Sequence, residues 1–107
     1  MSYTIPAQTS IGHVHLKVAD LNRALAFYKD LLGFEITQQY GDSAVFISAG
    51  GYHHHIGLNT WHSKNAGPAP VRTTGLYHVA ILYPTRKDLA TIFKRLEEAG
   101  YPLTGAS

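Results

Sequence analysis

Residues 11–33, IGHVHLKVADLNRALAFYKDLLG, contain a strand pattern that passes directly into a helix pattern. Apolar and polar residues alternate across 11–19, which is typical of a strand that buries one face. The apolar side holds Val14, Leu16 and Val18, and the polar side holds His13, His15 and Lys17. Asp20 then stands at the expected N-cap, and apolar residues recur at helical spacing until Gly33. The stretch predicts a half-buried strand followed by an amphipathic helix.

Three further strands are predicted before residue 62, at 34–39, 44–48 and 52–61, with turns at 40–43 and 50–51. In the strand 52–61, alternation predicts one face that holds His53, His55, Gly57, Asn59 and Trp61. His54, Ile56 and Leu58 share the other face, and His54 is expected on the helix side or an edge. A stretch rich in Gly, Pro, Asn and Ser follows, and it precedes a fifth strand at 76–82 and a second helix at 85–99.

These elements predict an α+β fold. We divide the chain into a flexible lead-in at 1–9, a complete β-α-β-β-β module at 10–61, a linker at 62–74 and the start of a second module at 75–107. The second module is represented by its first strand and helix, so the sequence is expected to be incomplete at its C-terminal end.

The two strand–helix units repeat each other at an offset of 65 positions. Ile11-Gly12-His13-Val14 aligns with Leu76-Tyr77-His78-Val79, and the predicted caps Asp20 and Thr85 also correspond. A repeat of this size suggests two copies of one supersecondary unit related by a pseudo-twofold axis. A single histidine on a solvated strand face is most often a polar surface residue without a binding role. The recurrence of histidine at the equivalent positions 13 and 78 instead favours a shared metal site.

Composition excludes several classes of protein. The 107 residues are 45% hydrophobic and carry a formal net charge of +2, with basic residues scattered along the chain, so nucleic-acid binding is not expected. No apolar run is long enough to span a membrane, and a cytoplasmic location is the expectation. The absence of cysteine excludes disulfides and thiolate metal sites, whereas seven histidines make imidazole the prominent ligand.

The first stretch resembles the opening module of the vicinal oxygen chelate superfamily, which includes glyoxalases, extradiol dioxygenases and bleomycin or fosfomycin resistance proteins. The segments GGYHHHIGLNTW (50–61) and RTTGLYHVAILYPTRKDLA (72–90) resemble, more narrowly, its catechol 2,3-dioxygenase-like branch. The resemblance implies paired β-α-β-β-β modules around a divalent metal, with His13 and His78 at the two first-strand ligand positions. Extradiol members add a glutamate from the last strand of the second module, which lies beyond this sequence.

The resemblance further implies a metal-dependent extradiol dioxygenase that opens the ring of a catecholic substrate. Fe(II) is the expected metal, and Mn(II), Zn(II) or Ni(II) are alternatives. His55 is the predicted acid/base, although a polar strand face would equally explain its pattern. The predicted substrate pocket comprises His15, His53, Asn59 and Trp61.

Two alternative functions stay open: a glyoxalase-like lyase of the same superfamily, and a non-catalytic binding or resistance module. The glyoxalase type takes a fourth ligand at the position of His55 or Gly57, where this sequence has no glutamate, so three protein ligands are favoured. The expected partner is a small aromatic or other small molecule. Unpaired strand edges also predict a homo-oligomer formed by module pairing or swapping.

Overall fold

A computed structural model describes residues 2–68, 72, 74–76 and 78–104. The chain forms two compact units, Met1–Ala66 and Gly67–Ser107. Each unit is described by itself. The division falls within the predicted linker, while the module boundaries that we drew from the sequence stay a prediction.

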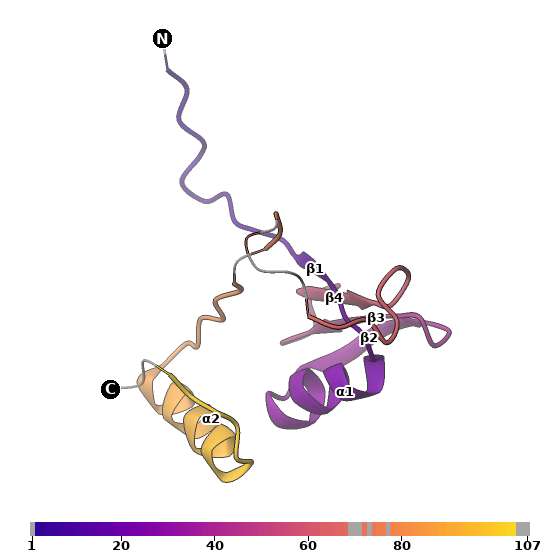
Figure 1. Ribbon diagram of the computed structural model, residues 1–107. Coiled ribbons are helices and arrows are strands. Elements are labelled where there is room, and N and C mark those ends of the chain that lie inside the picture. Colours follow the sequence, from indigo (N-terminus) through magenta and orange to yellow (C-terminus); the bar gives the residue numbers. More distant parts are fainter. Residues whose placement is uncertain (1, 69–71, 73, 77, 105–107) are drawn as a thin grey trace. The chain divides into compact units, whose positions relative to one another are not determined.

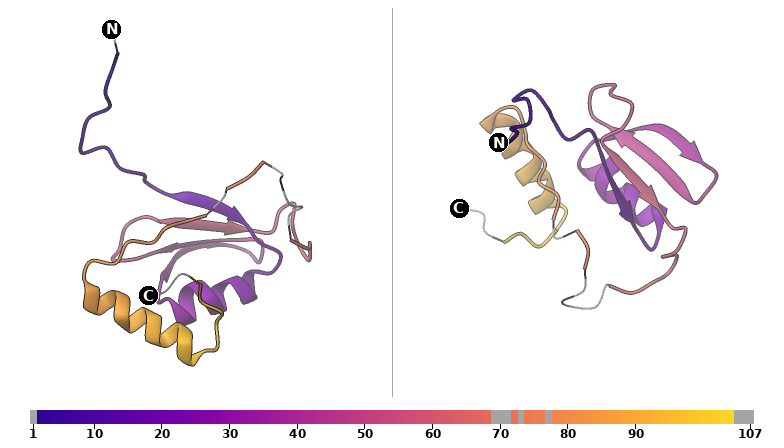
Figure 2. Two further views of the ribbon diagram at one scale, coloured as in Figure 1. Left: turned by 60° about the vertical axis from the view of Figure 1, so that its left-hand side comes forward. Right: turned by 90° about the horizontal axis from the view of Figure 1, so that it is seen from above.

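Among the described residues, the first unit contains a mixed four-stranded sheet with one helical segment on one of its faces (Figures 1 and 2). The strands are β1 (Val14–Lys17), β2 (Glu35–Tyr40), β3 (Ala44–Ser48) and β4 (Ile56–Asn59), in the spatial order β1-β4-β3-β2. β1 pairs with β4 in parallel, and the other two pairs are antiparallel. This arrangement confirms the predicted α+β class and the β-α-β-β-β order of the first module.

The first helical segment begins as predicted. The Asp20 carboxylate accepts a hydrogen bond from the Arg23 amide at 3.1 Å and caps α1 (Leu21–Leu25). The helix then widens into the π-helical segment η1 (Ala26–Leu31), in which the Leu32 amide reaches the Phe27 carbonyl at 2.9 Å. Gly33 ends it at a φ of 93°, a left-handed conformation that glycine adopts without steric cost.

The core of the first unit lies between α1 and the sheet. It consists of the buried residues Leu21, Val45, Ile47, Ile56 and Leu58. The three apolar residues of the first strand pattern, Val14, Leu16 and Val18, pack against this cluster. The alternation therefore correctly predicted that His15 and Lys17 would lie on the opposite face of the sheet.

In the second unit, α2 (Arg86–Glu98) forms where the sequence predicts a helix, and the Thr85 hydroxyl caps it by accepting from the Asp88 amide at 3.1 Å. The strand expected at 76–82 was wrong for the residues that the structure describes there, 76 and 78–82, while Tyr77 lies outside them. A strand exists only when its backbone pairs with a neighbour, and no described strand pairs with this segment. Leu82 is accordingly 95% exposed.

Within the described part of the chain, neither α2 nor any other helix is long and apolar enough to cross a membrane.

Candidate functional site

The face of the sheet opposite α1 carries aromatic and imidazole rings. On this face the His15 ring crosses over β4 at Gly57 and lies edge-on to Phe46, with ring centroids 5.9 Å apart. A Cβ atom at Gly57 would stand 2.7 Å from His15 Nδ1 and 3.0 Å from Phe46 Cε1. Glycine therefore lets these two rings approach the backbone closely, and a larger residue at this position would force the His15 ring to shift.

His54 belongs to this face, against the prediction that placed it on the helix side or an edge. Its ring centroid lies 4.3 Å from that of His13 and 4.7 Å from that of Phe46. The expected strand 52–61 was too long, because β4 begins only at Ile56. Side chains alternate between faces only inside a strand, so the alternation did not apply to the bent segment before β4.

Three histidines from two separate segments meet here. The ring of His53 lies 6.1 Å from that of His13, and its Nδ1 atom lies 3.1 Å from His54 Nδ1. A hydrogen bond between two imidazole nitrogens requires that one carries a proton and the other a lone pair. The two neighbouring rings are therefore expected to hold complementary protonation states at these atoms.

The pKa of His54 is lowered from its ordinary value of 6.5. Desolvation by burial is the largest cause, and repulsion from the positive charges of other histidines adds to it. These histidines are, in decreasing order of effect, His13, His53, His15 and His55. At neutral pH the His54 imidazole is therefore uncharged and able to accept a proton.

His55 faces the same side of the sheet but is held by the backbone. Its Nδ1 accepts a hydrogen bond from the Ala49 amide at 3.2 Å and lies 3.3 Å from the Ser48 hydroxyl. Because Nδ1 acts as an acceptor, a neutral His55 ring carries its proton on Nε2. Tyr52 stacks against the ring at 4.6 Å. These contacts give His55 an evident role in closing the turn between β3 and β4.

The remaining predicted pocket residues lie at the other end of this face. Trp61 is 56% exposed, and its ring packs 5.7 Å from that of His15. Its indole N–H donates to the Ser43 hydroxyl at 3.3 Å. Asn59 is buried and accepts from the Trp61 amide at 3.1 Å, which fixes the chain as it leaves β4. Trp61 therefore exposes part of its ring, the Asn59 side chain bonds within the turn, and the pocket roles of both residues stay predictions.

The two predicted metal ligands lie in different units. His13 directly precedes β1 in the first unit, and His78 lies in the second; both side chains are exposed. Imidazole nitrogens suit iron, manganese or zinc, so the donor chemistry fits a divalent metal. Among the described residues, however, no three potential ligands are placed so that they could hold one metal ion, the neighbouring rings of His13, His53 and His54 included. The described residues thus do not form a complete metal site.

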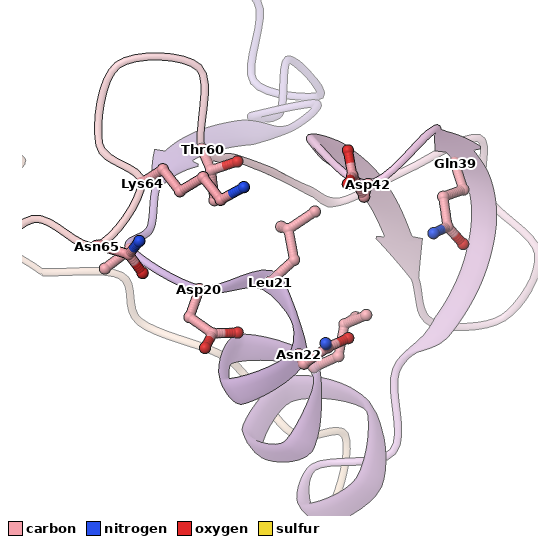
Figure 3. A pocket seen from close by; sticks show the side chains of 10 residues that line it. Asp20, Leu21, Asn22, Gln39, Asp42, Thr60, Lys64 and Asn65 are labelled. Atoms are coloured by element: carbon pink, nitrogen blue, oxygen red, sulfur yellow. The ribbon is translucent and has the colours of Figure 1, made fainter.

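A separate pocket of about 270 Å³ opens where the loops after β1 and β4 meet the β2–β3 turn (Figure 3). Figure 3 shows Lys64 and Thr60 across from Gln39 and Asp42, with Leu21 between them. Asp20 and Asn22, from the start of the helix, contribute to the same lining. None of the histidines predicted as site residues lines this pocket, so it is distinct from the histidine face.

Comparison with known proteins identifies the relatives of this chain. Residues 10–106 match the family model described as the Glyoxalase/Bleomycin resistance protein/Dioxygenase superfamily. The chain is 48% identical over 101 residues to the catechol-2,3-dioxygenase of Bacillus subtilis (strain 168), covering 94% of this chain and 35% of that protein. It is 31% identical over 104 residues to the biphenyl-2,3-diol 1,2-dioxygenase of Pseudomonas sp. (strain KKS102), covering 90% of this chain and 32% of that protein. The chain therefore spans about a third of the length of these relatives.

Solved structures share the fold at lower sequence identity. A lactoylglutathione lyase from Agrobacterium tumefaciens superposes with a TM-score of 0.67 at 21% identity, covering 94% of this chain and 76% of that one. A possible glyoxalase from Bacillus cereus gives a TM-score of 0.61, also at 21% identity, over 85% of this chain and 74% of that one. These likenesses support the predicted vicinal oxygen chelate fold, represented here in part.

Proposed function

Because the chain belongs to the glyoxalase/bleomycin resistance protein/dioxygenase superfamily, we propose that it acts as a metal-dependent extradiol dioxygenase on a catecholic substrate. The observation that carries this proposal is the pairing of His13 with His54, whose ring centroids lie 4.3 Å apart. An exposed imidazole at a family ligand position thus adjoins a second imidazole that is uncharged at neutral pH. The 48% identity to a catechol-2,3-dioxygenase supports the choice of this reaction within the superfamily.

His13 and His78 would hold the metal together with a carboxylate, and no group of three such ligands is found among the described residues. Two imidazoles and one carboxylate leave open positions, and this donor set is typical of Fe(II) sites that use dioxygen. Mn(II), Zn(II) and Ni(II) accept similar ligands. When bound, a ferrous ion supplies the redox chemistry that ring cleavage needs.

His54 is better placed than His55 to move the substrate proton. A neutral imidazole beside the substrate accepts a proton from a catechol hydroxyl, and it returns that proton to the ring-opened product. The lowered pKa of His54 keeps it in the accepting form at neutral pH. His55, which the sequence suggested for this role, already uses Nδ1 to accept from the Ala49 amide. Its catalytic role stays a prediction, and its Nε2 atom would have to perform it.

The rings on the same face suit a flat aromatic ligand. Phe46, His15 and Trp61 form a row in which neighbouring ring centroids lie 5.9 and 5.7 Å apart. Aromatic side chains receive another aromatic ring by offset stacking or edge-on contact. We propose that this row binds the ring of the substrate, with His53 beyond the His54 ring that contacts Phe46.

The proposal is tested with the purified chain after anaerobic loading with Fe(II). The measurements are bound iron per chain and the absorbance of the ring-opened product when catechol and dioxygen are added. We expect His13→Ala and His78→Ala to lose stoichiometric iron and turnover, and the matched control His62→Ala to retain both.

Retention of iron by both variants would contradict the ligand assignment. A wild-type chain that binds metal and isomerises a hemithioacetal with Ni(II) or Zn(II), but leaves catechol intact, would favour the glyoxalase-like alternative.

Analytical ultracentrifugation of the same sample tests whether the chain forms the expected homo-oligomer.

A further inference from the structure

Thr37 interrupts the pairing of β2 with β3. Ile36 pairs with Ile47 and Gln38 pairs with Phe46, so Thr37 is an extra residue that forms a β-bulge. A bulge turns its side chain out of the regular alternation, and such irregularities often redirect a side chain next to a functional site. The Thr37 hydroxyl is therefore free to bond outside the ladder of the sheet.

This hydroxyl reaches the backbone of the histidine segment. Thr37 Oγ1 donates to the carbonyl oxygen of His53 at 2.7 Å, and the Phe46 carbonyl lies at 3.2 Å from the same atom. A hydroxyl has one hydrogen to donate, so the shorter contact is the principal bond. It joins β2 to a segment 16 residues away in the sequence.

His54 lies between this bond and a second anchor. On its other side, the His55 amide donates to the Ile47 carbonyl at 2.9 Å, and the His55 carbonyl accepts from the Val14 amide at 3.0 Å. The backbone is thus fixed directly before and directly after His54. His54 lies outside β4, so strand pairing does not fix its backbone. The two anchors therefore determine the position from which the His54 side chain leaves the backbone.

We propose that Thr37 is a positioning residue, whose bond to the His53 carbonyl holds the His54 ring against Phe46 and His13. The catalytic consequence of this inference rests on the proposed function, whereas its structural consequence does not. The β-bulge at Thr37 would then help to position the His54 ring on the face of the sheet opposite α1.

The structural consequence is tested by NMR on the metal-free full chain. We expect cross-relaxation between the ring protons of His54 and Phe46, whose ring centroids lie 4.7 Å apart. Thr37→Val keeps the β-branched shape and removes the hydroxyl, so these signals should weaken by at least about twofold, because cross-relaxation falls steeply as rings separate. Thr37→Ser keeps the hydroxyl and should restore them. Thr91→Val is the matched control, since it removes a hydroxyl that donates to the Lys87 carbonyl within α2.

The catalytic consequence is tested with the iron-loaded full chain. Misplacing a proton-transfer group by about 1 Å can cost on the order of 100-fold in rate, so Thr37→Val should lower kcat by about 10- to 100-fold. KM should change little, because His15 and Trp61 are untouched, and Thr37→Ser should recover most of kcat.

The outcomes separate the two proposals. If wild type leaves catechol intact, the proposed function fails, and the NMR comparison still decides whether Thr37 places His54. Unchanged ring contacts in a folded Thr37→Val chain overturn the inference. A loss that Thr37→Ser fails to restore also overturns it, because the hydroxyl would then not be the cause.

Discussion

The two copies of the repeat share a sequence pattern but differ in structure. In the first, residues 14–17 form β1, because their backbone pairs through hydrogen bonds with the neighbouring strand β4. In the second, the equivalent segment forms no strand in its described residues, although its sequence aligns with that of the first copy at an offset of 65 positions. Both copies nevertheless form their helix. A helix satisfies its own backbone, whereas a strand depends on a partner elsewhere in the sequence.

The largest expected effect comes from placing proline at equivalent positions of the two copies. Leu16→Pro removes a backbone donor from β1, where Leu16 pairs with Leu58, and also removes a side chain that packs on the core. We expect it to destabilise the first unit by at least about 3 kcal/mol, judged from the cost of truncating buried leucines. Ile81→Pro should lower the free energy of unfolding of the first unit by less than about 0.5 kcal/mol, because the segment around Ile81 has no described strand pairing.

Urea unfolding followed by the fluorescence of Trp61 measures this difference, since the chain has one tryptophan and it lies in the first unit. Equal losses in the two variants would show that 76–82 is paired in solution, and the contrast between the copies would then disappear.

The local parts of this fold were predictable from the sequence. Both helices, their caps Asp20 and Thr85, and the strand at 44–48 follow from short-range patterns, and the structure confirms them. The metal-ligand assignments of His13 and His78 stay predictions, because they depend on residues from separate units.

The errors concern segments whose structure depends on distant partners. The alternation from 52 to 61 is a real pattern, but pairing with β3 and β1 sustains a strand only over Ile56–Asn59. His54 was therefore assigned to the wrong face. The role of Thr37 had no sequence signal, since a bulge arises from the register between two strands rather than from the residue itself.

A smaller effect should distinguish the two helices. Asp20→Ala and Thr85→Ala each remove a side chain that accepts from a first-turn amide, which costs about 1 kcal/mol. In the first unit the helix packs on a sheet, so Asp20→Ala should shift the Trp61 unfolding transition while the native helical circular dichroism is retained. Thr85→Ala should instead lower the helical signal of the native chain and leave that transition in place. A shift of the Trp61 unfolding transition by Thr85→Ala would contradict the expectation that the cap of α2 does not affect the stability of the first unit.

The smallest expected effect is a pH dependence that arises in the histidine face of the first unit. Since burial and the neighbouring histidines lower the pKa of His54 in the folded chain, the unfolded chain binds this proton more readily. The stability that the neutral His54 ring allows in the metal-free first unit is therefore fully present above the unfolded pKa of 6.5. It falls as the pH drops from there towards the folded pKa.

Replacing His54 with glutamine should flatten this part of the profile, whereas His62→Gln, outside the histidine cluster, should leave it unchanged. Urea midpoints measured between pH 7.5 and 5 with Trp61 fluorescence report the slope. A steeper decline in the His54→Gln chain would mean that other groups bind the proton and that the His54 ring does not lie where its contacts with His13 and Phe46 place it.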